Sequence, residues 1–417
     1  MNNLRTRAEY YLRTLVHDIG ARPVGSAANA RATDVVFRAL RSLDWRVEQI
    51  EFPCLDWQDR GSQLEFGGRQ YAISTGPFSP AVLAEAPIAV AATVPELARL
   101  SDAGCNGAIL LLHGAVAAEQ LFPKNFPFYQ VPEHQEIYRL IEACNPCAVL
   151  TATGRNQALA GAMYPFPMIE DGDFAIASAF MTTEEGALLI DAIASGTSTA
   201  AATLQIDAQR DDAVGANVIA CNDAWPAVDR SDDREPIVFT AHIDTKPGTP
   251  GALDNAAGVV VLLLLAELLA ERNPQRRIEL ALLNGEDHYA APGQVAYLAH
   301  TKSRAEQPAL AVNIDGVGLV NDSVAFSLYQ CPVAIAATLR TGLATVDKVI
   351  EGPIWYQGDH MLFVQQGVPA LALTTADLER LTGEIAHTAA DDLSNLDIDT
   401  LVSIAHTLAA LVGMVVI

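Results

Sequence analysis

The sequence predicts an α/β protein with a mostly parallel, mixed central sheet that helices cover on both faces. From about residue 203, short apolar segments such as 236–243 (PIVFTAHI) and 277–284 (RIELALLN) alternate with helical segments such as Ala256–Glu271. Nearly continuous apolar strands of this kind are typical of sheets buried on both sides. Half of the 417 residues are hydrophobic and 18% are charged, so the chain can bury a large core.

The first half of the chain contains an N-terminal part of the catalytic domain, followed by the segments of a separate, smaller unit. Helices are expected over 5–19 and 27–43, a strand over 45–52, and a hairpin around Gly67-Gly68. The next segments read as strands at 87–94, 107–114 and 147–153, with helices at 95–104 and 182–194 and a Pro-rich loop at 124–134. Because these segments contain no cluster of metal ligands, we expect residues 57–200 to form an inserted α+β domain. Residues 1–56 and 201–417 would form the catalytic domain.

The second half supplies the remaining elements of the large sheet. Strands are expected at 204–209, 216–221, 236–243, 277–284, 309–314, 323–329 and 368–375, and helices at Ala256–Glu271, 293–300, 332–344, 359–366 and 397–416. We find no internal repeat and no low-complexity segment.

Charge and cysteine content exclude several classes of protein. The formal net charge is −24, which argues against binding of nucleic acid or of an anionic membrane, since both need a basic face. The first twenty residues are polar and lack an apolar leader segment, so we expect a cytoplasmic location without a membrane span. Cys144 and Cys147 have CxxC spacing, but no second pair follows, so a structural use is favoured over redox or metal binding. Nothing in the sequence indicates the oligomeric state.

Polar side chains recur just past the predicted strands. His242, the pair Glu286-Asp287 and Asp315 each follow an inner strand, where ligands bind in open α/β sheets. Asp254 precedes a helix, and His387 lies between the last strand and the last helix. Taken singly, such residues are more often helix caps or ordinary surface histidines. Together they supply two histidines and three carboxylates, with one Glu to spare, and that set predicts a zinc site with its own base.

These residues lie in motifs that resemble the co-catalytic di-zinc aminopeptidase family, which includes bacterial leucyl aminopeptidases, glutamate carboxypeptidase and glutaminyl cyclase. The resemblance covers 203–417 and, more weakly, 1–53. The motifs, in order, are HID at 242–244, GALDNAAG at 251–258, GED at 285–287, NID at 313–315, GDH at 358–360, GVPAL at 367–371 and HTAADD at 387–392. HxD alone is a weak signal, but the ordered set is a specific one.

The resemblance implies a role for each residue. His242 and Asp315 would bind one Zn²⁺, and Asp287 and His387 the other. Asp254 would bridge the two metals and precede a cis peptide bond. Glu286 would be the general base, and Asp244 would orient the His242 imidazole. The implied reaction is removal of N-terminal residues from short peptides, with a peptide as the binding partner and two zinc ions per chain.

Two departures from the family and two alternatives stay open. Many members carry Tyr before the last zinc-binding His, where this chain has Ala386, so Tyr356 and Tyr289 become candidate oxyanion donors. The usual Gly-rich link after the carboxylate pair is replaced by HYAAPGQ. Asp359 either caps a helix or lines the pocket. The alternatives are a glutaminyl-cyclase-like acyl transferase and a non-catalytic binding protein, as in the transferrin receptor branch.

The inserted region also carries a resemblance of its own. Its strands, the helix at 95–104 and the run from Pro165 to Leu189 resemble a protease-associated domain. Such a domain would restrict access to the site. A passive or dimerising insert is the alternative.

Overall fold

The computed structural model divides the chain into two compact units. It describes residues 2–155, 164–196, 201–223, 225, 235–302, 304 and 307–414. Unit 1 contains Met1–Cys54 and Ala213–Ile417, and unit 2 contains Leu55–Asp212. The second boundary falls inside a strand, whereas we expected it at residue 200, before the strand begins.

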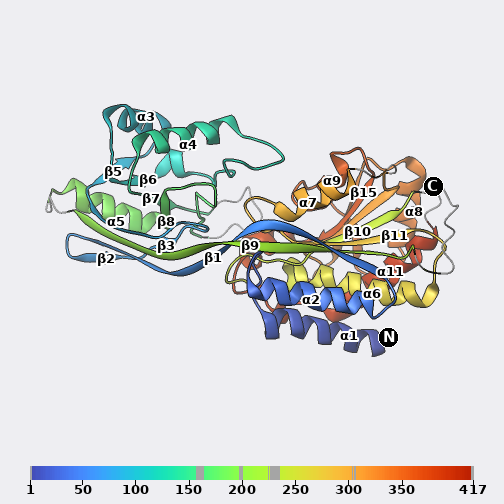
Figure 1. The fold of residues 1–417 in the computed structure, drawn as a ribbon. Helices are drawn as coiled ribbons and strands as arrows, with labels where there is room; N and C mark the ends of the chain where they lie inside the picture. Colours follow the sequence, from blue (N-terminus) through green and yellow to red (C-terminus); the bar gives the residue numbers. More distant parts are fainter. Residues whose placement is uncertain are drawn as a thin grey trace. The chain divides into compact units, whose positions relative to one another are not determined.

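Unit 1 is a layered α/β unit. Strands β14-β13-β15-β12-β10-β11-β9-β1 are neighbours in that order, where β1 spans Arg46–Phe66 and β9 spans Ala202–Cys221. Helices α1, α2 and α6 lie on one side of these strands, and α7 and α9 lie on the other (Figure 1). The pairs β10–β11, β10–β12, β12–β15 and β13–β14 are parallel, while β11–β9 and β13–β15 are antiparallel. The predicted mixed sheet with helices on both faces is therefore confirmed. Its elements are α1 (Asn2–Leu12), a π-helical turn (Arg13–Ile19), α2 (Ala27–Arg41), β10 (Ile237–His242), η3 (Ala252–Ala256), α6 (Ala257–Arg272), β11 (Ile278–Leu283), α7 (Pro292–Thr301), β12 (Leu310–Ile314), β13 (Val324–Tyr329), α8 (Val333–Leu343), β14 (Val349–Glu351), α9 (His360–Val364), β15 (Ala370–Thr375), α10 (Leu378–Arg380), η4 (Leu381–Ile385), η5 (Leu393–Asn395) and α11 (Ile398–Met414).

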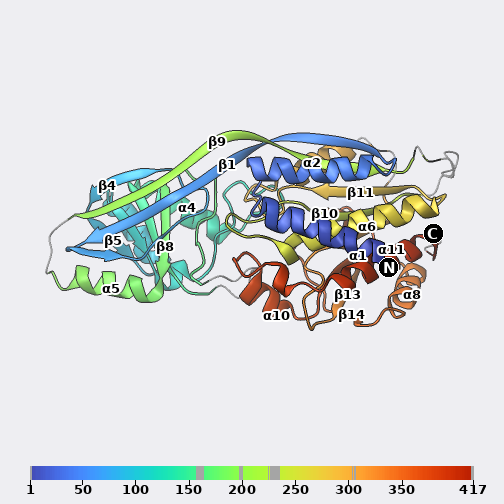
Figure 2. The same cartoon turned by 90° about the horizontal axis from the view of Figure 1, so that it is seen from below.

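Helix α6 is the central helix of this unit. Its residues from Ala257 to Leu269 are buried, and they pack in one core with side chains of α1, α2, α11 and the sheet. Together with the preceding turn, residues Ala252–Arg272 are long and apolar enough to cross a membrane by length and composition, but 89% of the apolar 18-residue window within this stretch is buried inside the protein. A helix that is hydrophobic all round is what a core position requires. Figure 2 shows α1, α2, α6 and α11 on the side of the sheet turned toward the viewer.

Unit 2 has its own sheet and two hydrophobic clusters. The strand order is β3-β8-β7-β6-β5, with β5–β6, β6–β7 and β7–β8 parallel and β3–β8 antiparallel. One cluster includes side chains of α3 and α4, and the other includes side chains of α5. The elements are β2 (Arg69–Tyr71), β3 (Ser74–Thr75), β4 (Val82–Ala86), β5 (Ile88–Ala91), α3 (Val94–Ala103), β6 (Ile109–Leu112), η2 (Gly114–Ala117), α4 (Pro132–Cys144), β7 (Ala148–Thr153), β8 (Ala177–Thr182) and α5 (Thr183–Ala194). The resemblance of this unit to a protease-associated domain stays a prediction.

Two long strands differ from the expected pattern. The strand expected over 45–52 extends as β1 (Arg46–Phe66), and the two strands expected at 204–209 and 216–221 form one strand, β9 (Ala202–Cys221). Polar, largely exposed residues around Asp211 interrupt the apolar pattern of β9 without interrupting its backbone pairing. The pattern of buried side chains therefore located the two ends of β9 but missed its exposed middle. The expected hairpin at Gly67-Gly68 is present, since β1 pairs with β2 in an antiparallel manner.

Candidate metal centre

The candidate site forms at the carboxyl edge of three adjacent parallel strands. His242, the last residue of β10, lies opposite Leu283 of β11, and Thr240 lies opposite Asn313 of β12. Residues that follow β11 and β12 therefore leave the sheet at the same level as His242. This register brings Glu286, Asp287 and Asp315 to one edge, as the strand-end pattern predicts.

One half of the site is built around His242, which is only 1% exposed. Its Nε2 atom lies 3.0 Å from Oδ1 of Asp254 and 3.6 Å from Oδ1 of Asp315. Burial alone would lower the pKa of this imidazole, but the neighbouring carboxylates, Asp315 foremost, raise it well above its ordinary value. An imidazole nitrogen thus points at two carboxylate oxygens that come from different loops.

The other half is built around His387. Its Nε2 atom lies 3.1 Å from Oδ2 of Asp254 and 3.0 Å from Oδ1 of Asp287. His387 follows η4 and has φ of 61°, a left-handed backbone conformation that is uncommon for a residue with a side chain. Again burial would lower the imidazole pKa, but Asp287 and Asp254 raise it well above its ordinary value.

Asp254 therefore faces both histidines, each with a different carboxylate oxygen. It lies in the turn that opens α6, and the Asp254–Asn255 peptide bond is cis, as the resemblance implied. The Asn255 side chain ties this turn down, because its Nδ2 donates to the carbonyl of Ile314 at 2.8 Å and its Oδ1 accepts the Gly258 N–H at 2.9 Å. The turn is thus joined to the end of β12, directly before Asp315.

Asp244 lies directly behind His242 and is fully buried. Nδ1 of His242 donates to the Asp244 main-chain carbonyl at 3.2 Å, and the Asp244 carboxylate lies 3.6 Å from the same nitrogen. Because a carbonyl can only accept, Nδ1 carries the proton and Nε2 is left free to bind a metal. The Asp244 carboxylate also accepts the main-chain N–H of Asp287 at 3.1 Å, so it connects the two strand ends.

The adjacent carboxylates Glu286 and Asp287 have different surroundings. Asp287 is 4% exposed, whereas Glu286 is partly exposed. Burial raises the pKa of Glu286 well above its ordinary value, against the lowering effect of His242, and the nearby carboxylates of Asp287 and Asp315 add to the rise. A carboxylate with a raised pKa thus stands next to one that lies 3.0 Å from Nε2 of His387.

The donor atoms fit a metal better than they fit one another. One ligand atom each from His242, Asp254 and Asp287 lies within 4.8 Å of the others. Nε2 of His242 and both carboxylate oxygens of Asp287 are buried and make no hydrogen bond to any residue that the structure describes. Buried polar atoms without partners are costly. Imidazole nitrogens and carboxylate oxygens are ligands that zinc accepts, so a bound cation would supply the missing interactions.

Other predicted residues lie outside this donor cluster or differ in role. Asp359 stands at the start of α9 but makes no capping hydrogen bond, so the expected cap is absent; its carboxylate accepts from Nε2 of Gln294 at 3.0 Å. Burial raises its pKa to about 7, against the lowering effect of His242. Tyr356 is 72% exposed, and Ala386 is buried in the hydrophobic core. The Tyr289 ring packs beside the imidazole of His288, with 4.5 Å between ring centroids.

Sequence reasoning missed two buried charged residues beside the site. Asp391 accepts the main-chain N–H groups of Leu253 and Asp254, and Arg22 contacts the loop that precedes them. Asp391 lies within the HTAADD motif, four residues after His387, and that position was a usable signal. Arg22 lies in a turn more than 200 residues away in the sequence, where no local pattern points to the site.

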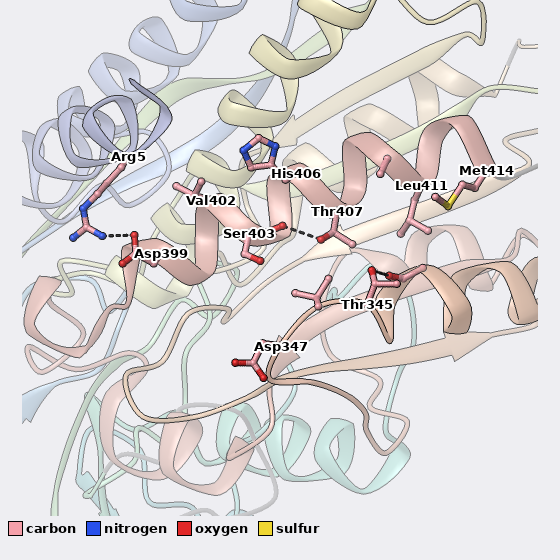
Figure 3. Close-up of a pocket in the computed structure, with 13 residues that line it drawn as sticks. Arg5, Thr345, Asp347, Asp399, Val402, Ser403, His406, Thr407, Leu411 and Met414 are labelled. Atoms are coloured by element: carbon pink, nitrogen blue, oxygen red, sulfur yellow. Dashed lines mark hydrogen bonds and ion pairs between the residues drawn. The ribbon is translucent and has the colours of Figure 1, made fainter. Parts of the chain in front are cut away.

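A pocket elsewhere in unit 1 shares no residue with this site. It has a volume of about 810 Å³ and lies among α8, α11 and Arg5 (Figure 3). Val402, Leu411 and Met414 contribute apolar walls, and the Arg5 side chain pairs with Asp399 at one end. Its lining offers no set of donors comparable with the strand-end cluster.

Comparisons with known proteins find a matching family model and similar folds. Residues 217–412 match the sequence model of peptidase family M28. The chain has the fold of an aminopeptidase from Aneurinibacillus sp. strain AM-1, with a TM-score of 0.70, 19% identity, and coverage of 98% of this chain and 93% of that one. A zinc aminopeptidase from Bacillus subtilis gives a TM-score of 0.70 at 19% identity, covering 98% and 94%. The fold class expected from the sequence is that of these proteins.

Curated relatives match only over short segments. A vacuolar membrane protease of Schizosaccharomyces pombe is 27% identical over 172 residues, which is 40% of this chain and 20% of that protein. A vacuolar membrane protease of Laccaria bicolor is 37% identical over 73 residues, 18% of this chain and 7% of that protein. The chain thus spans a fifth or less of the length of these relatives. Their names point to the vacuolar membrane and so contradict the cytoplasmic location expected from the polar N-terminal residues.

Proposed function

We propose that this chain is a zinc-dependent aminopeptidase, since residues 217–412 match the sequence model of peptidase family M28. It would remove the N-terminal residue from short peptides. The observation that carries the proposal is the position of Asp254, whose two carboxylate oxygens lie 3.0 Å from Nε2 of His242 and 3.1 Å from Nε2 of His387. One carboxylate between two imidazoles is the arrangement expected of a bridging ligand.

We assign two metal positions that share Asp254. His242 and Asp315 would complete the first, since Asp315 approaches His242 and no other histidine among the described ion pairs. His387 and Asp287 would complete the second, with their donor atoms 3.0 Å apart. Each position then has one imidazole nitrogen, one terminal carboxylate and one shared carboxylate, which leaves room for water and substrate.

The chemistry divides between the bound zinc and the residues of the chain. Zinc, when bound, supplies a Lewis acid that polarises the scissile carbonyl and makes water more acidic. Glu286 would take a proton from the attacking water and return it to the leaving amine, because it is the carboxylate outside the ligand set and partial loss of solvation raises its pKa. Asp244 would keep the His242 imidazole in the tautomer that frees Nε2.

The substrate would be held by its own N-terminal ammonium group. The edge that carries the ligands is rich in carboxylates, among them Asp359 beside the ligand set, and this environment favours a cation over a blocked amine. Ala386 has no polar side chain and its main-chain N–H donates to Leu381 at 2.8 Å, so an oxyanion donor cannot come from that position. Tyr289, three residues after Glu286, is the nearer of the two candidate tyrosines in sequence.

A panel of substrates tests the proposal. Purified protein with zinc should release the chromophore from aminoacyl anilides that have a free amine, and should leave the N-acetylated forms of the same anilides intact. Elemental analysis should give two zinc ions per chain. Cyclisation of an N-terminal Gln peptide without anilide hydrolysis would instead support the acyl transferase, and cleavage of the acetylated anilides would reject an aminopeptidase.

A further inference from the structure

Arg22 is a fully buried cation in the turn between the N-terminal helices. Its guanidinium donates to the carbonyls of Ile243 at 2.6 Å, Pro250 at 2.7 Å and Gly251 at 2.9 Å. Its main-chain N–H donates to Oγ1 of Thr245 at 3.0 Å. These four partners belong to the loop that joins His242 to Asp254, and Nη1 also donates to the carbonyl of Gly20 at 3.3 Å. A buried arginine usually pairs with a carboxylate, but here the planar group is used to hold main-chain carbonyls.

Asp391 holds the same loop from its other end. Its Oδ1 accepts the N–H of Leu253 at 2.7 Å, and its Oδ2 accepts the N–H of Asp254 at 3.1 Å. Its main-chain carbonyl accepts the N–H of Ala252 at 3.1 Å. Arg22 therefore binds the carbonyls of Ile243, Pro250 and Gly251, and Asp391 binds the amides of the three residues that follow.

The loop has few other means of holding its path. Residues 243–250 form no helix or strand, so their main-chain polar groups depend on contacts of this kind. Gly251 lies at φ of 65°, and a Cβ atom there would meet Cγ2 of Thr245 at 2.2 Å and Nη2 of Arg22 at 3.2 Å. The guanidinium thus lies directly against the loop, with no space for a side chain between them.

The charge of Arg22 also suits its position. Asp391, Asp244, Asp254 and Asp287 are the carboxylates whose charges act on the guanidinium, in that order. Arg22 contacts none of the metal-facing oxygens. It therefore offsets part of the mutual repulsion of these carboxylates without competing for their donor atoms.

We propose that Arg22 is a positioning residue, which fixes the loop from Ile243 to Gly251 so that His242 and Asp254 present their metal-binding atoms to one another. This segment of the chain lies outside residues 217–412, the part that matches the family. The proposal rests on the proposed function for the identity of the metal, but the loop contacts themselves do not depend on it.

The test uses Arg22→Lys, which keeps the charge but loses the planar fork, and Arg22→Met, which loses both. Asn222→Ala is the matched control, because Asn222 is also fully buried and its side chain bonds the main chain at Arg276 and Ile278, at the opposite end of β11. Zinc affinity is measured by competition with a chelator. The visible spectrum of the Co²⁺-substituted protein reports the ligand geometry.

We expect both Arg22 variants to bind zinc about 10- to 100-fold more weakly and to change the Co²⁺ spectrum. Asn222→Ala should lower the melting temperature but leave affinity and spectrum unchanged. If Arg22→Met yields no folded protein, Arg22→Lys decides. Wild-type zinc affinity and an unchanged spectrum in a folded Arg22 variant would overturn the proposal.

Hydrogen exchange separates this proposal from the proposed function. In metal-free protein, the amides of Leu253 and Asp254 should exchange about tenfold faster in Arg22→Lys than in wild type, since one end of the loop is released. That result would stand even if the wild type proved to bind no zinc. Unchanged exchange in an active, zinc-binding protein would reject the role of Arg22 and leave the peptidase assignment intact.

Discussion

Gly258, in the first turn of α6, lies against the carbonyl of Ile314 at the end of β12, and Gly258→Ala is the sharpest test of how the site is assembled. A Cβ atom there would lie 2.3 Å from the carbonyl oxygen of Ile314 and 2.4 Å from Oδ1 of Asn255. Carbon and oxygen atoms in contact lie about 3.3 Å apart or more, so one element would have to move by about 1 Å. The Ile314 carbonyl already accepts from Asn255, and Asp315 next to it donates its N–H to Leu373.

The magnitude follows from two opposing effects. Overpacking of a buried site costs about 1–3 kcal/mol. Alanine gains about 0.5–1 kcal/mol over glycine inside a helix. The net loss of unfolding free energy is then about 0–2.5 kcal/mol, with a midpoint near 1.25 kcal/mol. At about 2–4 °C per kcal/mol for a domain of this size, the midpoint lowers the melting temperature by about 3–5 °C. Zinc affinity should fall as well, because Asp254 and Asp315 are displaced relative to one another.

The assay is thermal unfolding followed by circular dichroism, with Gly413→Ala as the control. Gly413 also lies in a helix, α11, but a Cβ atom there would meet nothing within 4 Å. This control should therefore gain about 0.5 kcal/mol through the loss of backbone freedom in the unfolded chain. A Gly258→Ala protein that melts at or above the wild-type temperature, beside a control that behaves as expected, would refute the reasoning.

Three further perturbations have defined outcomes. Burial lowers the pKa of the His360 imidazole from 6.5 to about 4, so between these pH values the unfolded chain binds a proton that the folded chain does not. The free energy of unfolding should therefore fall by up to about 3 kcal/mol as the pH drops through this range. His360→Gln should remove this pH dependence from urea-unfolding measurements. Tyr297→Phe removes a 2.7 Å hydrogen bond to buried Glu279 and should cost about 1–3 kcal/mol in urea unfolding, with zinc affinity unchanged. Chelation should lower the melting temperature and added zinc should restore it; an unaffected melting curve would contradict the metal assignment.

The site was largely predictable because its residues obey a rule of sheet geometry. His242, Glu286, Asp287 and Asp315 follow inner strands, and parallel pairing of β10, β11 and β12 brings the ends of those strands together. Helix α6 and these strands were also predictable, because their side chains are buried and buried segments are apolar in sequence.

The parts that were missed depend on long-range contacts. Arg22 occupies a turn whose local sequence indicates only a turn, and its role follows from carbonyls more than 220 positions later in the chain. The helix α4 begins at Pro132, inside a Pro- and aromatic-rich segment expected to be a loop. The middle of β9 is polar and exposed, so its strand conformation depends on pairing rather than on the burial of apolar side chains.

The central claim is that Glu286 acts as a base outside the metal ligands, and the most direct test is turnover of an aminoacyl anilide by Glu286→Gln at full zinc content. Elemental analysis should give the wild-type amount of zinc, while the turnover number falls by about 10²- to 10⁴-fold. Glu271→Gln, which alters an exposed carboxylate on α6, should leave both quantities unchanged. Turnover within a few-fold of wild type in the zinc-loaded Glu286→Gln protein would contradict the account.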